Sequence, residues 1–211
     1  MTDRTQRIDA FLAQTTELLG RLDRQAIDRA VSILLECHKD SRCVYTLGNG
    51  GSASTAAHFA CDLAKYVVPR GGRPFDARCL TDNVPLYTAW ANDAPREDVF
   101  VNLLRGRLRP GDCVLAVSVH GGAGFSADLV RAVRYARQVG ARTIALVGFD
   151  GGLLHQEADC SILVPVESTP QTEGIHLVIG HLLMHLVKEE LAAAGGDGDG
   201  QSGGNAETDA G

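Results

Sequence analysis

Five short apolar runs alternate with helical patterns from residue 43 onward, and this alternation constrains the fold more than any other feature. The runs predict buried strands over residues 43–47, 77–80, 113–117, 143–147 and 161–164. Helical periodicity predicts helices over residues 53–66, 84–92, 97–107, 126–139 and 172–194. Strands that are apolar on both faces, each followed by a helix, indicate a parallel sheet covered on both sides. We therefore expect an α/β fold, a three-layer αβα sandwich with a five-stranded parallel sheet.

The two ends of the chain differ from this central pattern. Residues 4–38 carry two more helical patterns, and we expect a helical hairpin over residues 1–40 that makes oligomer contacts. The main domain is expected over residues 41–194. Residues 195–211 are rich in Gly, Asp, Ser and Asn and contain no basic residue, so they cannot build a core. We expect a disordered, acidic, Gly-rich tail there.

Composition argues against several classes of protein. The chain has 211 residues and a formal net charge of −6, which argues against non-specific nucleic-acid binding. No apolar run approaches the roughly 18 residues of a membrane span, and the first residues have no apolar signal core. The six cysteines form no C-x-x-C pair, which favours buried free thiols. We expect a soluble cytoplasmic protein with neither a nucleic-acid nor a membrane partner.

A glycine-rich turn separates the first predicted strand from the next helix. It contains Asn49, Gly50, Gly51 and Ser52. Glycines let the backbone approach an anion closely, and the helix N-terminus offers free N–H donors. The turn lacks the third glycine of the dinucleotide-binding pattern and the lysine of the Walker pattern. It therefore predicts a site for one phosphate group, with an ordinary glycine-rich turn as the alternative.

A second Gly/Ser loop follows the third predicted strand and contains Ser118, His120 and Ser126. Ser126 or Asp128 also qualifies as the N-cap of the next helix. The carboxyl ends of parallel strands lie at one edge of the sheet, where ligands bind in folds of this kind. We therefore expect the two loops to wrap the same phosphate.

Two predicted helices carry groups suited to chemistry. His58 and Asp62 are four residues apart, so they share one helix face. Glu173, His176 and His181 border one polar stripe on the otherwise apolar last helix. His58, Asp62, Glu173 and His181 together form a plausible ligand set for zinc or another divalent ion. They are equally suited to acid/base transfer of protons along a sugar, and spacing leaves both roles open.

In combination, the motifs resemble the sugar isomerase (SIS) domain family, and within it the phosphoheptose isomerases, over roughly residues 5–192. The resemblance rests on the first loop and on six further segments: His58-Phe59-Ala60-x-Asp62-Leu63, Thr81-Asp82-Asn83, Ala91-Asn92-Asp93, Gly111-Asp112-Cys113-Val114-Leu115, Gly148-Phe149-Asp150-Gly151-Gly152 and Ile175-His176 with His181.

This resemblance implies a flavodoxin-like SIS fold and an aldose–ketose isomerase that converts sedoheptulose 7-phosphate to D-glycero-D-manno-heptose 7-phosphate through an enediol. It implies a homotetramer with sites at subunit interfaces and a divalent metal, with zinc preferred. The implied metal ligands are His58, Asp62, Glu173 and His181. The implied substrate-binding residues are Asn49, Gly50, Gly51, Ser52, Asp93, Ser118, His120 and Ser126.

The chain departs from the family pattern at two acidic positions. Asp62 stands where the family has a glutamate that serves as ligand and base, and Glu173 stands where it has a glutamine. Asp62 reaches about 1.5 Å less far than a glutamate, one bond length. The implied catalytic residues are Asp62, His181 and Glu173, with Asp62 as the first choice of base and Glu173 as the second. A non-catalytic SIS scaffold or sugar-phosphate-binding protein, as in the DnaA initiator-associating type, is the alternative.

Overall fold

The protein is described here by a computed structural model that covers residues 3–69, 71–122 and 124–196. The predicted acidic tail lies, from residue 197 onward, outside the described residues. Within the described ranges, no helix is both long enough and apolar enough to cross a membrane.

One five-stranded parallel sheet forms the centre of the molecule, as the apolar runs predicted, with the strand order β2-β1-β3-β4-β5. Its strands are β1 (Cys43–Gly48), β2 (Asp76–Cys79), β3 (Cys113–Ser118), β4 (Arg142–Gly148) and β5 (Cys160–Val164). After β1 the chain first adds β2 on one side and then β3 on the other. The flavodoxin-like fold is therefore confirmed, and its topological switch point lies between β1 and β3.

Eight α-helices and one 3₁₀ helix are described. They are α1 (Arg4–Gly20), α2 (Arg24–Lys39), α3 (Gly51–Ala64), α4 (Val84–Asp93), η1 (Arg96–Asp98), α5 (Val99–Leu104), α6 (Ala127–Val139), α7 (Gly152–Glu157) and α8 (Thr169–Gly196). The single helix predicted over residues 97–107 is instead η1 followed by the short α5. Helix α7 was not predicted, because six residues are too few for a helical period to show.

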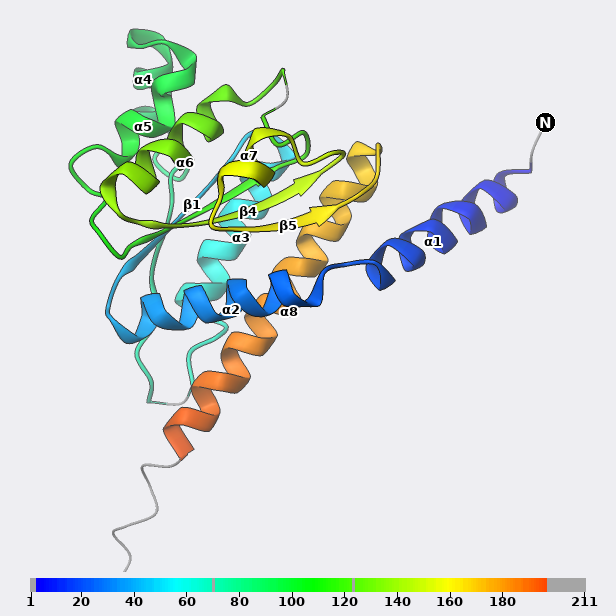
Figure 1. Cartoon of the computed structure of the whole chain (residues 1–211), viewed down its shortest axis with the longest axis horizontal. Helices are drawn as coiled ribbons and strands as arrows, with labels where there is room; N and C mark the ends of the chain where they lie inside the picture. Colours follow the sequence, from blue (N-terminus) through cyan, green and yellow to red (C-terminus); the bar gives the residue numbers. More distant parts are fainter. Residues whose placement is uncertain (1–2, 70, 123, 197–211) are drawn as a thin grey trace, which may run out of the picture.

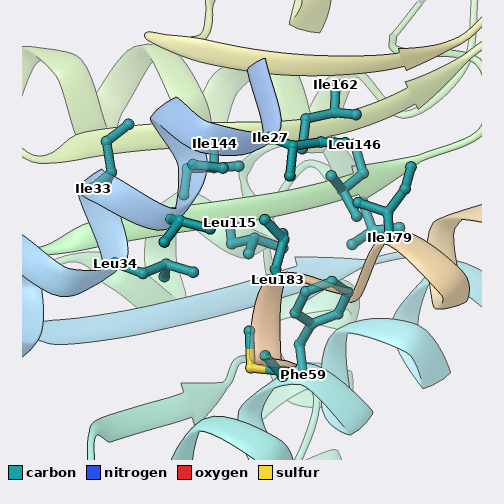
Figure 2. Close-up of a cluster of buried hydrophobic side chains, with 14 of the residues drawn as sticks. Ile27, Ile33, Leu34, Phe59, Leu115, Ile144, Leu146, Ile162, Ile179 and Leu183 are labelled. Carbon is teal, nitrogen blue, oxygen red and sulfur yellow. The ribbon is translucent and has the colours of Figure 1, made fainter. Parts of the chain in front are cut away.

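Both faces of the sheet are buried under helices (Figure 1). Helices α2, α3 and α8 cover one face, where they pack on side chains such as Leu115, Ile144 and Ile162 (Figure 2). Helices α4, α5, α6 and α7 lie over the other face, against Val114 and its neighbours. Successive residues of β3 thus enter different layers, because side chains alternate along a strand.

The N-terminal helices differ in position from the expected hairpin. Helix α2 packs on the sheet, and its residues Ile27 and Leu34 belong to the same core as Leu115 (Figure 2). Asp23 caps α2 by accepting hydrogen bonds from the backbone N–H groups of the first turn. Helix α1 alone projects away from the body (Figure 1), with only Leu18 buried. A separate oligomerisation unit over residues 1–40 stays a prediction.

Helices α3 and α8 lie side by side and run in the same direction, because Gly51 faces Glu173 and Phe59 faces Gly180. At Gly180 a Cβ atom would lie 2.7 Å from the ring of Phe59, which is almost completely buried. The absence of a side chain at Gly180 therefore sets how closely the two helices approach.

Gly180→Ala is expected to destabilise the protein relative to Gly174→Ala, by about 1–3 kcal/mol, because the new methyl group overpacks the Phe59 ring. Gly174 is the matched control, since it lies on the same helix with nothing within 4 Å of its Cβ position. Urea unfolding of both variants measures the difference. Equal stability would contradict the close packing of α3 on α8.

His176 lies fully buried where α8 crosses β4, and neither ring nitrogen has a hydrogen-bond partner among the described residues. Burial lowers the pKa of His176 to about 4. The folded protein therefore holds this imidazole neutral, whereas the unfolded chain protonates it near its ordinary pKa of 6.5.

Between pH 6.5 and pH 4 the unfolded chain binds the extra proton, so the stability that His176 contributes is present above pH 6.5 and is lost as the pH falls. We expect a loss of up to about 3 kcal/mol from this group across that window. His176→Leu should make the pH dependence of urea unfolding shallower there. His185→Leu removes an exposed histidine of the same helix and serves as the control. An unchanged pH profile in His176→Leu would contradict the effect.

Candidate functional site

The two glycine-rich loops meet at the switch point of the sheet and line one pocket of about 280 Å³. Its lining residues come from the ends of β1 and β3, their following loops and the first turns of α8: Asn49, Gly50, Gly51, Ser52, Val117, Ser118, Val119, His120, Ser126, Thr169 and Glu173. The structure therefore brings together seven of the eight predicted substrate-binding residues. None of the lining residues is a lysine or an arginine.

The first loop can approach a ligand closely because of its glycines. Gly50 has a φ of 55°, in the left-handed region that favours glycine. A Cβ at Gly51 would lie 2.5 Å from Glu173 Oε1, so glycine leaves room for that carboxylate where it stands. Ser52 is buried at the first turn of α3, beside the free N–H groups of that helix. The Ser52 hydroxyl and the backbone N–H groups at the start of α3 thus lie close together beside the loop pocket.

The second loop is held by its own contacts. The Ser118 hydroxyl accepts a hydrogen bond of 3.1 Å from the Gly121 N–H. The His120 ring lies between Phe125 and Phe149, with centroid distances of 5.2 and 4.4 Å. Ser126 occupies the N-cap position of α6 with a φ of 57°, but its side chain makes no capping hydrogen bond. Its hydroxyl is therefore free to serve a ligand.

Asp128 is a residue of the site whose role the sequence did not indicate. It is buried, and its two carboxylate oxygens accept hydrogen bonds of 3.1 and 2.9 Å from the side-chain amide of Asn49. This contact joins the first loop to α6. Asn49, Ser126 and Asp128 also line an adjoining pocket of about 360 Å³, together with Arg96 and Glu97. The sequence offered Asp128 only as a helix cap, and Arg96, Glu97 and Thr169 carried no signal.

His58, Asp62 and His181 form a compact group between α3 and α8. Their ligand atoms all lie within 4.8 Å of one another. His58 Nε2 is 3.0 Å from His181 Nε2 and 3.3 Å from Asp62 Oδ2. The His58 side chain is 49 % exposed and that of Asp62 18 %, so the group is open to a ligand.

This donor set fits a divalent metal. Two imidazoles and one carboxylate are the three protein ligands of many catalytic zinc sites, which keep a fourth position open. Nitrogen atoms about 2.0–2.1 Å from one tetrahedral zinc lie about 3.3 Å apart, close to the spacings observed here. His58, Asp62 and His181 would hold the ion.

Two predicted site residues lie elsewhere. Glu173 is not a member of the histidine–aspartate group found among the described residues; its carboxylate lies against Gly51 and lines the loop pocket. Asp93 ends α4, is exposed, and accepts a hydrogen bond of 2.7 Å from Asn92. It lines neither of the two pockets described above. Metal binding by Glu173 and substrate binding by Asp93 stay predictions, as do the roles of the other site residues.

The chain is similar to known proteins along most of its length. Residues 10–148 match the model of the SIS domain. The lincomycin biosynthesis protein LmbN of Streptomyces lincolnensis is 36% identical over 180 residues, which cover 82% of this chain and 66% of that protein. A phosphoheptose isomerase of Chlorobaculum parvum is 33% identical over 186 residues, covering 87% of this chain and 88% of the relative.

Solved structures agree with this similarity. The structure of phosphoheptose isomerase GmhA from Neisseria gonorrhoeae has a TM-score of 0.79 and 25% identity, and the alignment covers 89% of this chain and 100% of that one. The chain therefore belongs to the SIS domain family and is phosphoheptose isomerase-like within it.

Proposed function

We propose that the loop pocket and the His58–Asp62–His181 group are two ends of one active site for aldose–ketose isomerisation of a sugar phosphate. The protein is an isomerase, and its relatives named phosphoheptose isomerase favour sedoheptulose 7-phosphate as the substrate. The observation that carries the proposal is the placement of an anion pocket and an acid/base group along the same helix, α3.

The spacing of the two ends suits a seven-carbon sugar phosphate. Ser52 and His58 are six residues apart on α3, which corresponds to about 9 Å along the helix axis. An extended chain of seven carbons spans about 7–8 Å from the first carbon to the last, to which the phosphate ester adds length. The axial separation of Ser52 and His58 therefore matches the length of the substrate, while the two side chains point about 120° apart around α3, so the substrate would curve around the helix.

The pocket binds the phosphate without a cation among its lining residues. Backbone N–H groups at the start of α3 and the hydroxyls of Ser52, Ser118 and Ser126 supply the donors. Dipolar donors fixed in place hold an anion without the strong attraction of a paired charge, which favours release of the product.

Proton transfer falls to the carboxylates and His181. Asp62 is the first choice to take the proton from the carbon next to the carbonyl and return it to the neighbouring carbon. His181 donates to the oxygen as charge develops in the enediol. Glu173, which lies nearer the phosphate loop, is the second choice of base. A bound zinc ion would polarise the carbonyl and stabilise the oxyanion.

Asp62→Asn is expected to lower turnover of sedoheptulose 7-phosphate by about 100-fold or more, because it removes the base and keeps the shape. Glu173→Gln tests the second candidate, and Glu189→Gln, an exposed residue of α8, is the control. Formation of the aldose is followed by NMR. Normal turnover in both Asp62→Asn and Glu173→Gln would contradict the assignment of the base, whereas no turnover by the unaltered protein would favour a non-catalytic sugar-phosphate-binding protein.

Zinc binding is tested apart from activity. Mass spectrometry of the native protein is expected to find zinc, which a chelator removes, and His58→Ala should lower the zinc affinity by at least about tenfold. His155→Ala, a histidine of α7 outside the group, is the control. The same zinc content in His58→Ala and His155→Ala would exclude this site.

We also propose that the protein is a cytoplasmic homotetramer whose subunits cover α1 and the histidine face of α8. Ile8, Phe11 and Leu12 on α1 are 51, 45 and 58 % exposed. Leu177 and Leu182, which flank His181 in the sequence of α8, are exposed as well. Apolar surface on this scale favours association between copies of the chain.

Phe11→Asp is expected to reduce the particle to smaller species, because a charge on the apolar face of α1 cannot be buried without cost. Light scattering measures the mass. Gln6→Asp introduces the same charge at an exposed polar position of α1 and should leave the mass unchanged. An unchanged mass in both variants would show that α1 does not mediate assembly.

A further inference from the structure

A second polar pocket lies at the opposite edge of the sheet from the loop pocket, at the amino ends of β1 and β2. Its volume is about 320 Å³, similar to the 280 Å³ of the loop pocket. The residues that line it are Ser41, Arg42, Cys43, Tyr45, Asp76, Arg78, Gly106, Arg107, Arg109 and Asp112. Four arginines thus face one hollow in a protein whose net charge is −6.

The two carboxylates of this pocket are already engaged. Asp76 makes a bidentate pair with Arg78, with distances of 2.8 and 2.9 Å. Asp112 is buried, and its two oxygens accept hydrogen bonds of 3.0 and 2.8 Å from the backbone N–H groups of Cys43 and Arg109. These carboxylates therefore hold Arg78 and the backbone around the pocket in place.

The other three arginines have no such partner. Within the described ranges, Arg42, Arg107 and Arg109 have no carboxylate oxygen within 4.0 Å of their charged groups. Guanidinium groups that line one pocket without a carboxylate counterion repel one another, and an anion bound in the pocket reduces that repulsion. The exposed side chains of these arginines can change rotamer to contact such an anion.

The backbone around these arginines is well fixed. Gly111 has a φ of 85°, and a Cβ atom there would lie 3.1 Å from Arg42 Nε, so glycine lets this side chain lie across the turn. The Tyr45 hydroxyl donates a weak hydrogen bond of 3.4 Å to the Arg107 carbonyl. Burial raises the pKa of Tyr45, which keeps this hydroxyl protonated as a donor.

We propose that this pocket is a second anion site, which binds a small molecule carrying at least two phosphate charges and lies apart from the isomerase site. Three unpaired guanidinium groups exceed the charge of a single carboxylate, and their planar fork matches phosphate oxygens in pairs. The site goes beyond the proposed isomerisation, because none of its residues lines the loop pocket or belongs to the histidine–aspartate group.

Isothermal titration of the full-length protein with inorganic pyrophosphate tests the proposal. Arg107→Ala is expected to weaken pyrophosphate binding by about tenfold, the effect of losing a charge-assisted hydrogen bond. Arg105→Ala is the matched control: it removes the same charge two residues away, from a side chain outside the pocket, and should bind like the unaltered protein. Arg107→Lys keeps the charge but loses the fork, so an intermediate affinity is expected.

Further experiments distinguish pyrophosphate binding at the arginine pocket from binding at the loop pocket. Ser52→Ala should leave pyrophosphate binding at the arginine pocket intact, and Arg107→Ala should keep normal turnover of the sugar phosphate, so this proposal and the isomerase proposal fail independently. ADP should compete with pyrophosphate, whereas succinate should not. Identical isotherms for Arg107→Ala and Arg105→Ala, or equal binding of succinate and pyrophosphate, would overturn the proposal.

Discussion

The burial of the parallel sheet on both faces is the constraint on which the rest of the structure depends. Alternate side chains of the strands pack against two helical layers. Parallel strands also need crossover connections, and each connection between strands here contains at least one helix. The chain extends the sheet from β1 first to β2 and then, on the other side, to β3. The loops after β1 and β3 are therefore left together, with no connection lying between them.

A second constraint is the close contact of α3 with α8. Glycines at both ends of this contact, Gly51 and Gly180, let Glu173 and the Phe59 ring fill the space where side chains would stand. The two helices run in the same direction, so residues at a similar distance from their N-termini contact each other. His58 Nε2 therefore lies 3.0 Å from His181 Nε2. The loop pocket at the start of these helices and the His58–Asp62–His181 group farther along them thus result from one packing arrangement.

Much of this arrangement follows from the sequence. The apolar runs predicted all five strands to within a residue of their ends, since a strand buried on both faces cannot be polar. Strand β2 is the exception to this reason, because it contains Asp76 and Arg78 and is mostly exposed. Glycine and serine after strands 1 and 3 indicated a pocket at this edge of the sheet, which the structure contains. The same reasoning missed α7, predicted one helix over residues 97–107 where the structure has two, and did not predict that α2 packs on the sheet. These features depend on the tertiary contacts of each segment.

The sequence by itself determined the fold class, the positions of the two glycine-rich loops and the residue types available for chemistry, because strand burial and helix termini leave local signals. Only the tertiary structure decided which groups meet. It joined His58 and Asp62 to His181 across more than 100 residues of chain, turned Glu173 toward Gly51 in the first glycine-rich loop and bonded Asp128 to Asn49. It also gathered four arginines from separate segments into one hollow. Such contacts depend on crossing angles and close approaches between helices and strands, and no local pattern encodes these.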